Sequence, residues 1–344
     1  MSTQIALLLG QDGIINGAIY ALLALSILLV FSVTRIMFIP QGEFVSFSAL
    51  TMAAMQTGRP VYAGFLVLGL AAVGLVMDLA EDRSRGGWRA TRSGLGFLVY
   101  ALAITAFTWA VPMKGAGQLA QIALTLLLIV PMGPLFYRVF FQPIAAQSPL
   151  VLLIVAIAVH VALVGVGLLM FGAEGGRTEP FSSAMFRLGP AIIRSQTLWV
   201  IGLSIVAIVA LALFFGRTLY GKALRATAID RMGAELMGIS PNFAGKLTLG
   251  LAALIGALSG ILIAPITTFY YDTGFIIGLK GFVGAVMGGL VSYPLAAIGS
   301  LIIGQVESFS TFWASTYKEV IVFTLILPVL LYLSLSHKTK EDSE

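Results

Sequence analysis

The sequence predicts an all-α polytopic membrane protein, and two observations support this. Hydrophobic residues make up 59% of the 344 residues and charged residues only 10%, with a mean hydropathy of +1.00. Such a chain cannot present the charged surface of a soluble domain. The apolar residues form continuous runs rather than an alternating pattern, which is typical of membrane helices rather than barrel strands. We therefore expect one transmembrane domain over residues 1–344.

The length of each apolar run sets the expected number of spans. A bilayer core takes roughly 20 apolar residues per helix, so the chain divides into about ten helices, within a range of about eight to eleven. The runs lie near residues 13–34, 42–57, 61–79, 94–112, 118–139, 149–171, 197–215, 246–268, 275–306 (interrupted) and 319–335.

The positions of Lys and Arg predict the orientation, because cytoplasmic segments hold the excess of these residues. The pattern favours an N-terminus outside and a C-terminus in the cytoplasm. The loop "EDRSRGGWRATR" (81–92) and the segment 217–246 then lie inside. Seven of the 20 basic residues stay on the outer side: Arg59, Lys114, Arg177, Arg187, Arg194, Lys280 and Lys318.

The composition argues against several classes of protein. The chain has no cysteine, and its two histidines, His160 and His337, are too far apart in sequence for a metal centre. His160 has no evident carboxylate partner. The stretch "GRTLYGKA" (216–223) is similar to a phosphate-binding loop, but Ala223 stands where the magnesium-binding hydroxyl belongs and an apolar helix precedes it. We expect no enzyme, no bound cofactor or metal, and no nucleic acid partner.

The segment 217–246 differs from the other polar segments in its helical composition. From residue 222 it is rich in Ala, Leu, Met and Arg, and it ends in Gly-Ile-Ser-Pro, which predicts one short helix and its stop. Either the helix docks on a cytoplasmic partner, or lipid headgroups hold it at the interface. In the docking alternative the contact residues are Arg225, Asp230, Arg231, Ala234, Glu235 and Gly238.

Polar residues, proline and glycine interrupt two apolar runs. Broken membrane helices are tolerated where neighbouring protein or a cavity satisfies the freed backbone groups, so each break marks either a translocation pathway or a plain loop. The residues of the breaks are Pro40, Gln41, Gly42 and Glu43 in the first, and Gly284, Gly288, Gly289, Ser292 and Pro294 in the second.

Glu43 has two possible roles. A carboxylate inside a membrane marks a functional site by default, whereas at the first turn of a helix it favours the positive end of the helix dipole. The order Pro-Gln-Gly-Glu before an apolar run favours the second role, a cap. The glycine pairs Gly256/Gly260 and Gly284/Gly288 predict ordinary helix packing.

Four segments resemble the permease subunits of bacterial branched-chain amino acid ABC importers, the LivH type. They are "NGAIYALLALSILLVFSVTRIMFIPQGEF", "FFQPIAAQSPLVLLIVAIAVH", "RTLYGKALRATAIDRMGAELMGI" and "GLKGFVGAVMGGLVSYPLAAIGSLIIGQVES". They occur in family order and cover most of the chain except about 60–135, where we expect an extra helix pair. Two departures occur: only the Gly-Glu end of the family's Asn-Phe-Ala-His-Gly-Glu remains, and the glutamate after Asp230-Arg231 is lost.

The resemblance implies an ABC importer permease in the bacterial inner membrane that moves an amino acid or a related small polar solute. It also implies partners: a second, LivM-like permease, two cytoplasmic ATPases that bind the ATP, and a periplasmic binding protein. It makes 222–240 the ATPase-docking helix and the second break a pathway element. The alternative is a stand-alone ion-coupled transporter, for which only Glu43, Asp272 and Glu307 are candidate intramembrane carboxylates. A receptor or scaffold would not need broken helices.

Overall fold

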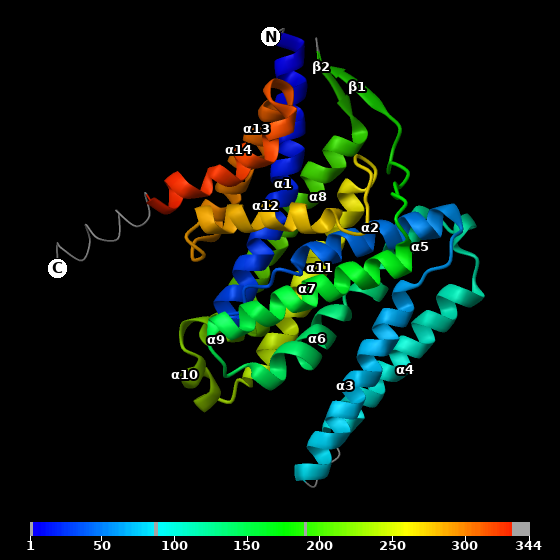
Figure 1. The fold of residues 1–344 in the computed structure, drawn as a ribbon, viewed down its shortest axis with the longest axis vertical. Helices are drawn as coiled ribbons and strands as arrows, with labels where there is room; N and C mark the ends of the chain where they lie inside the picture. Colours follow the sequence, from blue (N-terminus) through cyan, green and yellow to red (C-terminus); the bar gives the residue numbers. More distant parts are fainter. Residues whose placement is uncertain (1–2, 86–88, 189–190, 332–344) are drawn as a thin grey trace, which may run out of the picture.

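The computed structural model describes residues 3–85, 89–188 and 191–331, so His337 lies outside the described residues. The fold is a bundle of helices with one antiparallel β-hairpin (Figure 1). The helices are α1 (Thr3–Thr34), α2 (Gln41–Thr57), α3 (Ala63–Arg85), α4 (Arg89–Ala110), α5 (Gln118–Ile129), α6 (Met132–Phe136), α7 (Pro149–Phe171), α8 (Ser195–Arg217), α9 (Leu219–Ile229), α10 (Arg231–Leu236), α11 (Pro241–Ile263), α12 (Thr273–Met287), α13 (Tyr293–Trp313) and α14 (Lys318–Thr324). The strands are β1 (Met185–Leu188) and β2 (Ala191–Arg194), and short helical turns are η1 (Met113–Gly115), η2 (Tyr137–Phe141), η3 (Gln142–Ile144) and η4 (Ser315–Tyr317).

Eight helices in the described ranges are long and apolar enough to cross a membrane. They include α1 and α11, and one continuous run, Gln118–Ile144, that takes in α5, α6, η2 and η3. One shorter apolar helix, α12 with 15 residues, and the 17-residue α2 pack in the same bundle. The all-α polytopic fold is therefore confirmed, and the interrupted run 275–306 consists of two helices, α12 and α13.

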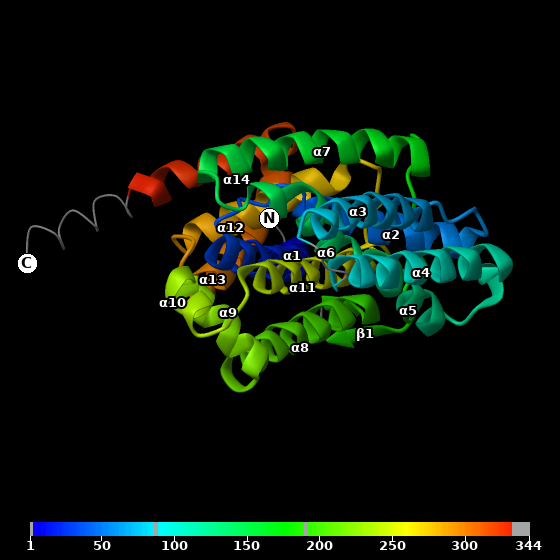
Figure 2. The same ribbon diagram turned by 90° about the horizontal axis from the view of Figure 1, so that it is seen from below.

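The two ends of the bundle differ in structure. Helix α8 runs from β2 to α9, so one end carries the β-hairpin and the other carries α9 and α10 (Figure 1). We call these ends the hairpin side and the α10 side. Helix α1 is buried along much of its length and packs against α8, α11, α12 and α13. Figure 2 shows α7 and α8 on opposite faces with α1 and α11 between them.

Helices α3 and α4 form an antiparallel pair at one edge of the bundle. A buried salt bridge joins these two helices to the rest of the bundle. Arg138 Nε on η2 donates to Asp78 Oδ1 on α3 over 2.6 Å, and Arg138 Nη2 lies 2.8 Å from Glu81 Oε2. Both Arg138 and Asp78 are buried. Such charges are costly in a membrane unless they are paired, so this contact fixes how α3 sits against η2.

Glycines let helices approach until their backbones touch. A Cβ atom on Gly42 of α2 would lie only 2.0 Å from the backbone oxygen of Gly274 on α12, and one on Gly260 of α11 would lie 2.2 Å from the backbone oxygen of Val45. Helix α2 is therefore held between α11 and α12 with no side chain as a spacer. The prediction that Gly256/Gly260 and Gly284/Gly288 pack helices is confirmed, since all four face neighbouring helices or turns of this chain.

Candidate translocation and coupling sites

The first break holds a pair of polar side chains in the middle of the bundle. Helix α2 begins at Gln41, and Glu43 in its first turn is 2% exposed. Glu43 Oε1 lies 2.5 Å from His160 Nδ1 on α7, and the His160 ring stacks on Phe275 of α12 with 4.2 Å between ring centroids. The expectation that His160 has no carboxylate partner is therefore wrong. The two residues are 117 positions apart, so no local pattern reveals the pair.

The expected capping role of Glu43 is replaced by this contact between helices. Pro40 occupies the N-cap position of α2, and no side-chain hydrogen bond caps the helix. Gln41 Nε2 donates to the backbone oxygen of Ala252 on α11 over 2.9 Å. Two buried oxygens, Gln41 Oε1 and Glu43 Oε2, have no hydrogen-bond partner within the described residues. Buried acceptors of this kind are costly, so the first break keeps unused capacity to accept hydrogen bonds.

We expect His160→Leu to destabilise the protein by about 2 kcal/mol, more than the ~1 kcal/mol expected for Glu43→Gln, because the leucine leaves a buried carboxylate without its partner. In the Glu43→Gln background His160→Leu should cost clearly less. A double-mutant cycle of thermal unfolding in detergent measures the difference. Additive losses would mean that the two side chains do not interact.

The second break is a tight connection between two helices. Residues 288–292 join α12 to α13, with Gly289 at φ +64° and Leu290 at φ +55°. Ser292 caps α13 and Pro294 lies in its first turn. Tyr293 meets Ser32 near the end of α1 and Phe215 near the end of α8, which places this connection on the α10 side. The second break is thus a short loop between two helices, and a role of its residues in the translocation pathway stays a prediction.

A buried charge cluster links α1, α12, α13 and α14. Lys280 is 3% exposed, and its Nζ donates to Glu307 Oε1 over 2.5 Å and to Glu319 Oε1 over 3.0 Å. Tyr20 on α1 donates its hydroxyl to Glu307 Oε2 over 2.5 Å, and Lys280 Nζ lies 5.8 Å from the centre of the Tyr20 ring. Lys280, which the count of basic residues assigned to the outer side, is therefore a buried residue whose charge the cluster neutralises inside the bundle.

The segment expected as one docking helix is two. Asp230 is in an extended conformation and separates α9 from α10, and its Oδ1 accepts from Met232 N over 3.0 Å as an N-cap. Helix α10 ends as expected at Gly238: φ is +85°, Ile239 N–H donates to the Ala234 carbonyl and Gly238 N–H to the Glu235 carbonyl. This is a Schellman motif, which needs glycine at that position.

The exposed side chains of α9 and α10 are a mixture of apolar and charged groups. Ala234 is buried at 5% exposure, so this expected contact residue faces its own chain, whereas Arg225, Arg231 and Glu235 are exposed. The most exposed apolar residues of the two helices are Leu219, Ile229, Met232 and Leu236, and Met237 follows them. Apolar groups gathered on a surface are typical of a contact with protein or membrane.

A hydrogen bond connects α10 to the segment before α7. Arg231 Nη1 donates to the backbone oxygen of Ala145 over 3.1 Å. Residues of both segments line a shared cavity of about 440 Å³. In the stretch "GRTLYGKA", Thr218 caps α9 and Gly221 and Lys222 lie within that helix, so this stretch forms no strand-and-loop phosphate site.

Comparisons with known proteins agree with this architecture. Residues 11–330 match the family described as "Branched-chain amino acid transport system / permease component". The chain is 26% identical over 353 residues to the high-affinity branched-chain amino acid transport system permease protein LivH of Escherichia coli (strain K12), which covers 96% of this chain and 95% of the relative. LivH of Salmonella typhimurium gives the same values.

A second relative covers part of the chain. The permease protein BraD of Pseudomonas aeruginosa is 28% identical over 222 residues, which is 62% of this chain and 72% of the relative. No solved structure matches. Because the family match covers most of the sequence and agrees with the helical bundle, this chain belongs to the family of permease components of branched-chain amino acid transport systems.

Proposed function

We propose that the chain is one of two permease subunits of an ATP-driven importer that moves an apolar amino acid into the cytoplasm. A second, LivM-like permease, two cytoplasmic ATPases and a periplasmic binding protein complete the complex, and the ATPases bind the ATP. Membership of a permease family supports a transport role without catalysis by this chain. The names of LivH and BraD support branched-chain amino acids as substrate.

One observation carries the assignment of the α10 side as the ATPase contact. Helices α9 and α10 present apolar side chains that no other part of the described chain covers, with Met232 at 74% and Leu236 at 83% exposure. Arg225, Asp230, Arg231, Glu235 and Gly238 lie beside them or form the turns that hold them. The α10 side is then cytoplasmic and the hairpin side periplasmic, with the N-terminus periplasmic and the C-terminus cytoplasmic.

The proposed pathway uses the first break. Pro40, Gln41, Gly42 and Glu43 lie where α2, α7 and α12 meet, and two acceptor oxygens there are unpartnered within the described residues. Of the second break, Gly288, Gly289 and Ser292 form the connection from α12 to α13, whereas Gly284 lies within α12 and Pro294 in the first turn of α13. A stand-alone secondary transporter finds no support in the family match, which is to a component of a multi-part transport system.

Cysteine crosslinking tests the assignment. The chain has no cysteine of its own, so single cysteines at Met232 and Leu236 report only their own contacts. We expect both to crosslink to the co-expressed ATPase subunit, because these side chains are exposed, whereas a cysteine at the buried Ala234 should not. A cysteine at Tyr317 on the hairpin side should be labelled from the periplasm. Periplasmic labelling at Met232 would reject both the contact and the orientation.

A further inference from the structure

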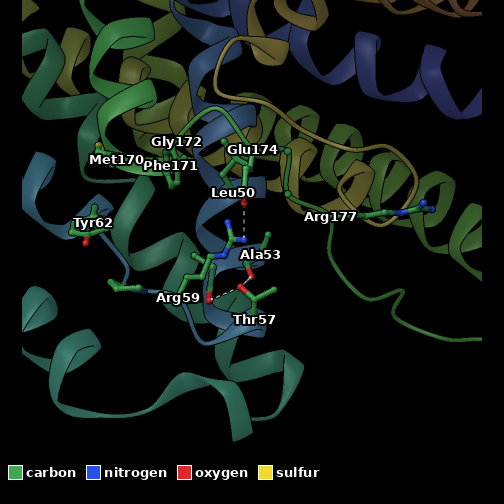
Figure 3. Close-up of a pocket in the computed structure, with 14 residues that line it drawn as sticks. Leu50, Ala53, Thr57, Arg59, Tyr62, Met170, Phe171, Gly172, Glu174 and Arg177 are labelled. Atoms are coloured by element: carbon green, nitrogen blue, oxygen red, sulfur yellow. Dashed lines mark hydrogen bonds and ion pairs between the residues drawn. The ribbon is translucent and has the colours of Figure 1, made fainter.

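A cavity of about 320 Å³ opens on the hairpin side between the end of α2 and the end of α7. Its walls come from α2, the segment after it up to Tyr62, and the loop that follows Phe171 (Figure 3). This volume is at the small end of the range for ligand pockets, so it suits a small solute.

The inner wall of the cavity is apolar. Leu50, Ala53 and Ala54 of α2 are buried at 4%, 5% and 8% exposure, and Phe171 of α7 faces the same space. An aliphatic side chain of a ligand placed here would leave water for apolar surface, which is favourable.

The mouth of the cavity carries one charge of each sign. Arg59 Nη2 lies 3.0 Å from Glu174 Oε2, and the two side chains are 59% and 78% exposed. Figure 3 shows Arg59 reaching toward Glu174, with Leu50 and Ala53 beside the pair. An ion pair this exposed contributes little stability, so a ligand bearing both charges can replace it at small cost. Arg177 points away and donates from Nε and Nη2 to the Pro265 oxygen.

The cavity lies at the outer end of a seam between α2 and α7. Phe47 packs on Phe171, with 5.6 Å between ring centroids, and on Gly167. One turn further into the bundle along α2 is Glu43 with its partner His160. Helical spacing places Glu43, Phe47 and Leu50 on one face of α2, so the seam runs from the charged mouth past an aromatic contact to a buried polar pair.

We propose that this cavity is an outer binding site for a zwitterionic amino acid with an apolar side chain, the entrance to the α2–α7 seam. Arg59 binds the ligand carboxylate, Glu174 binds the ammonium group, and the wall formed by Leu50, Ala53 and Ala54 accepts the aliphatic side chain. The site rests on the proposed function, since it names where this permease receives its substrate. Binding opens the Arg59–Glu174 pair and replaces it with two charge-assisted contacts.

Binding of radiolabelled leucine to the permease–ATPase complex in nanodiscs, without the binding protein, tests the site. We expect Arg59→Met and Glu174→Gln each to weaken binding about tenfold or more, because each removes one charged contact. Lys114→Met and Glu179→Gln remove exposed charges of the same signs outside the cavity and should stay within about twofold. Leucinamide lacks the carboxylate, so unlabelled leucinamide should displace radiolabelled leucine from the native protein less well than unlabelled leucine does. For the Arg59→Met variant, the two compounds should displace radiolabelled leucine equally well.

Three outcomes would overturn the site. The first two are no measurable leucine binding by the native complex and equal affinities in the cavity and control variants. The third is faster uptake by the Arg59→Met/Glu174→Gln double variant, which would mean that the ion pair closes the cavity and does not bind the ligand. ATP hydrolysis stimulated by the binding protein is measured on the same samples. If stimulation persists while the site fails, the proposed function stands without it. If the ATPase does not associate, the proposed function itself fails.

Discussion

Lys280→Met is expected to lower the stability of the folded permease by about 3–5 kcal/mol, because it leaves two carboxylates in a largely buried cluster without their cation. Glu307 is 7% exposed, and its Oε1 accepts a hydrogen bond from Lys280 Nζ. The same Nζ donates to Glu319 Oε1 at the start of α14. The loss should appear as a lower unfolding temperature in detergent and less protein in the membrane.

A triple variant separates loss of charge balance from loss of packing. In Lys280→Met/Glu307→Gln/Glu319→Gln no charge remains, and neutral replacements of a buried ion pair are often tolerated, so most of the lost stability should return. Lys222→Ala removes an exposed lysine from α9 and serves as the matched control, with an expected change within about 0.5 kcal/mol. A stable Lys280→Met single variant would show that the cluster does not hold α14.

Gly42→Ala should separate α2 from α12 and destabilise the protein by about 1–3 kcal/mol or more, since an added methyl group meets backbone that cannot rotate away. The new Cβ would lie 2.0 Å from the Gly274 oxygen and 2.5 Å from its carbon. Thermal unfolding, together with the yield of assembled complex, measures the effect.

Gly202→Ala in α8 is the control for this substitution. No atom lies within 4 Å of a Cβ placed there, and alanine favours the helix over glycine by roughly 1 kcal/mol, so this variant should be neutral or slightly more stable. If Gly42→Ala and Gly202→Ala had the same unfolding temperature, the backbones of α2 and α12 would not be in close contact in the folded protein.

Hydropathy alone predicts the class of fold and nearly every span, because each membrane helix must satisfy its own backbone and needs a fixed length of apolar sequence. The stop at Gly238 is equally local, since a Schellman motif depends on a few adjacent residues. The break between α9 and α10 carried a local signal as well: aspartate is a preferred N-cap, and Asp230 caps α10.

The contacts of the charged residues could not be predicted in this way. Lys280 finds Glu307 27 residues away and Glu319 39 residues away, and Glu43 finds His160 across 117 residues. Which helices become neighbours decides these pairs, and periodicity within one helix does not contain that information. For the same reason, the count of basic residues by side of the membrane could not show that Lys280 is buried and paired with carboxylates.

The hydrogen bond from Arg231 to Ala145 connects α10 to the segment that leads into α7. Ala145 lies four residues before α7, a helix of 23 residues and so about 34 Å long, whose far end leads into the loop that carries Glu174. A helix is stiff along its axis, so the two ends of α7 keep a fixed separation, one beside α10 and the other beside the outer cavity. The α10 side and the outer cavity are thereby connected through one rigid element.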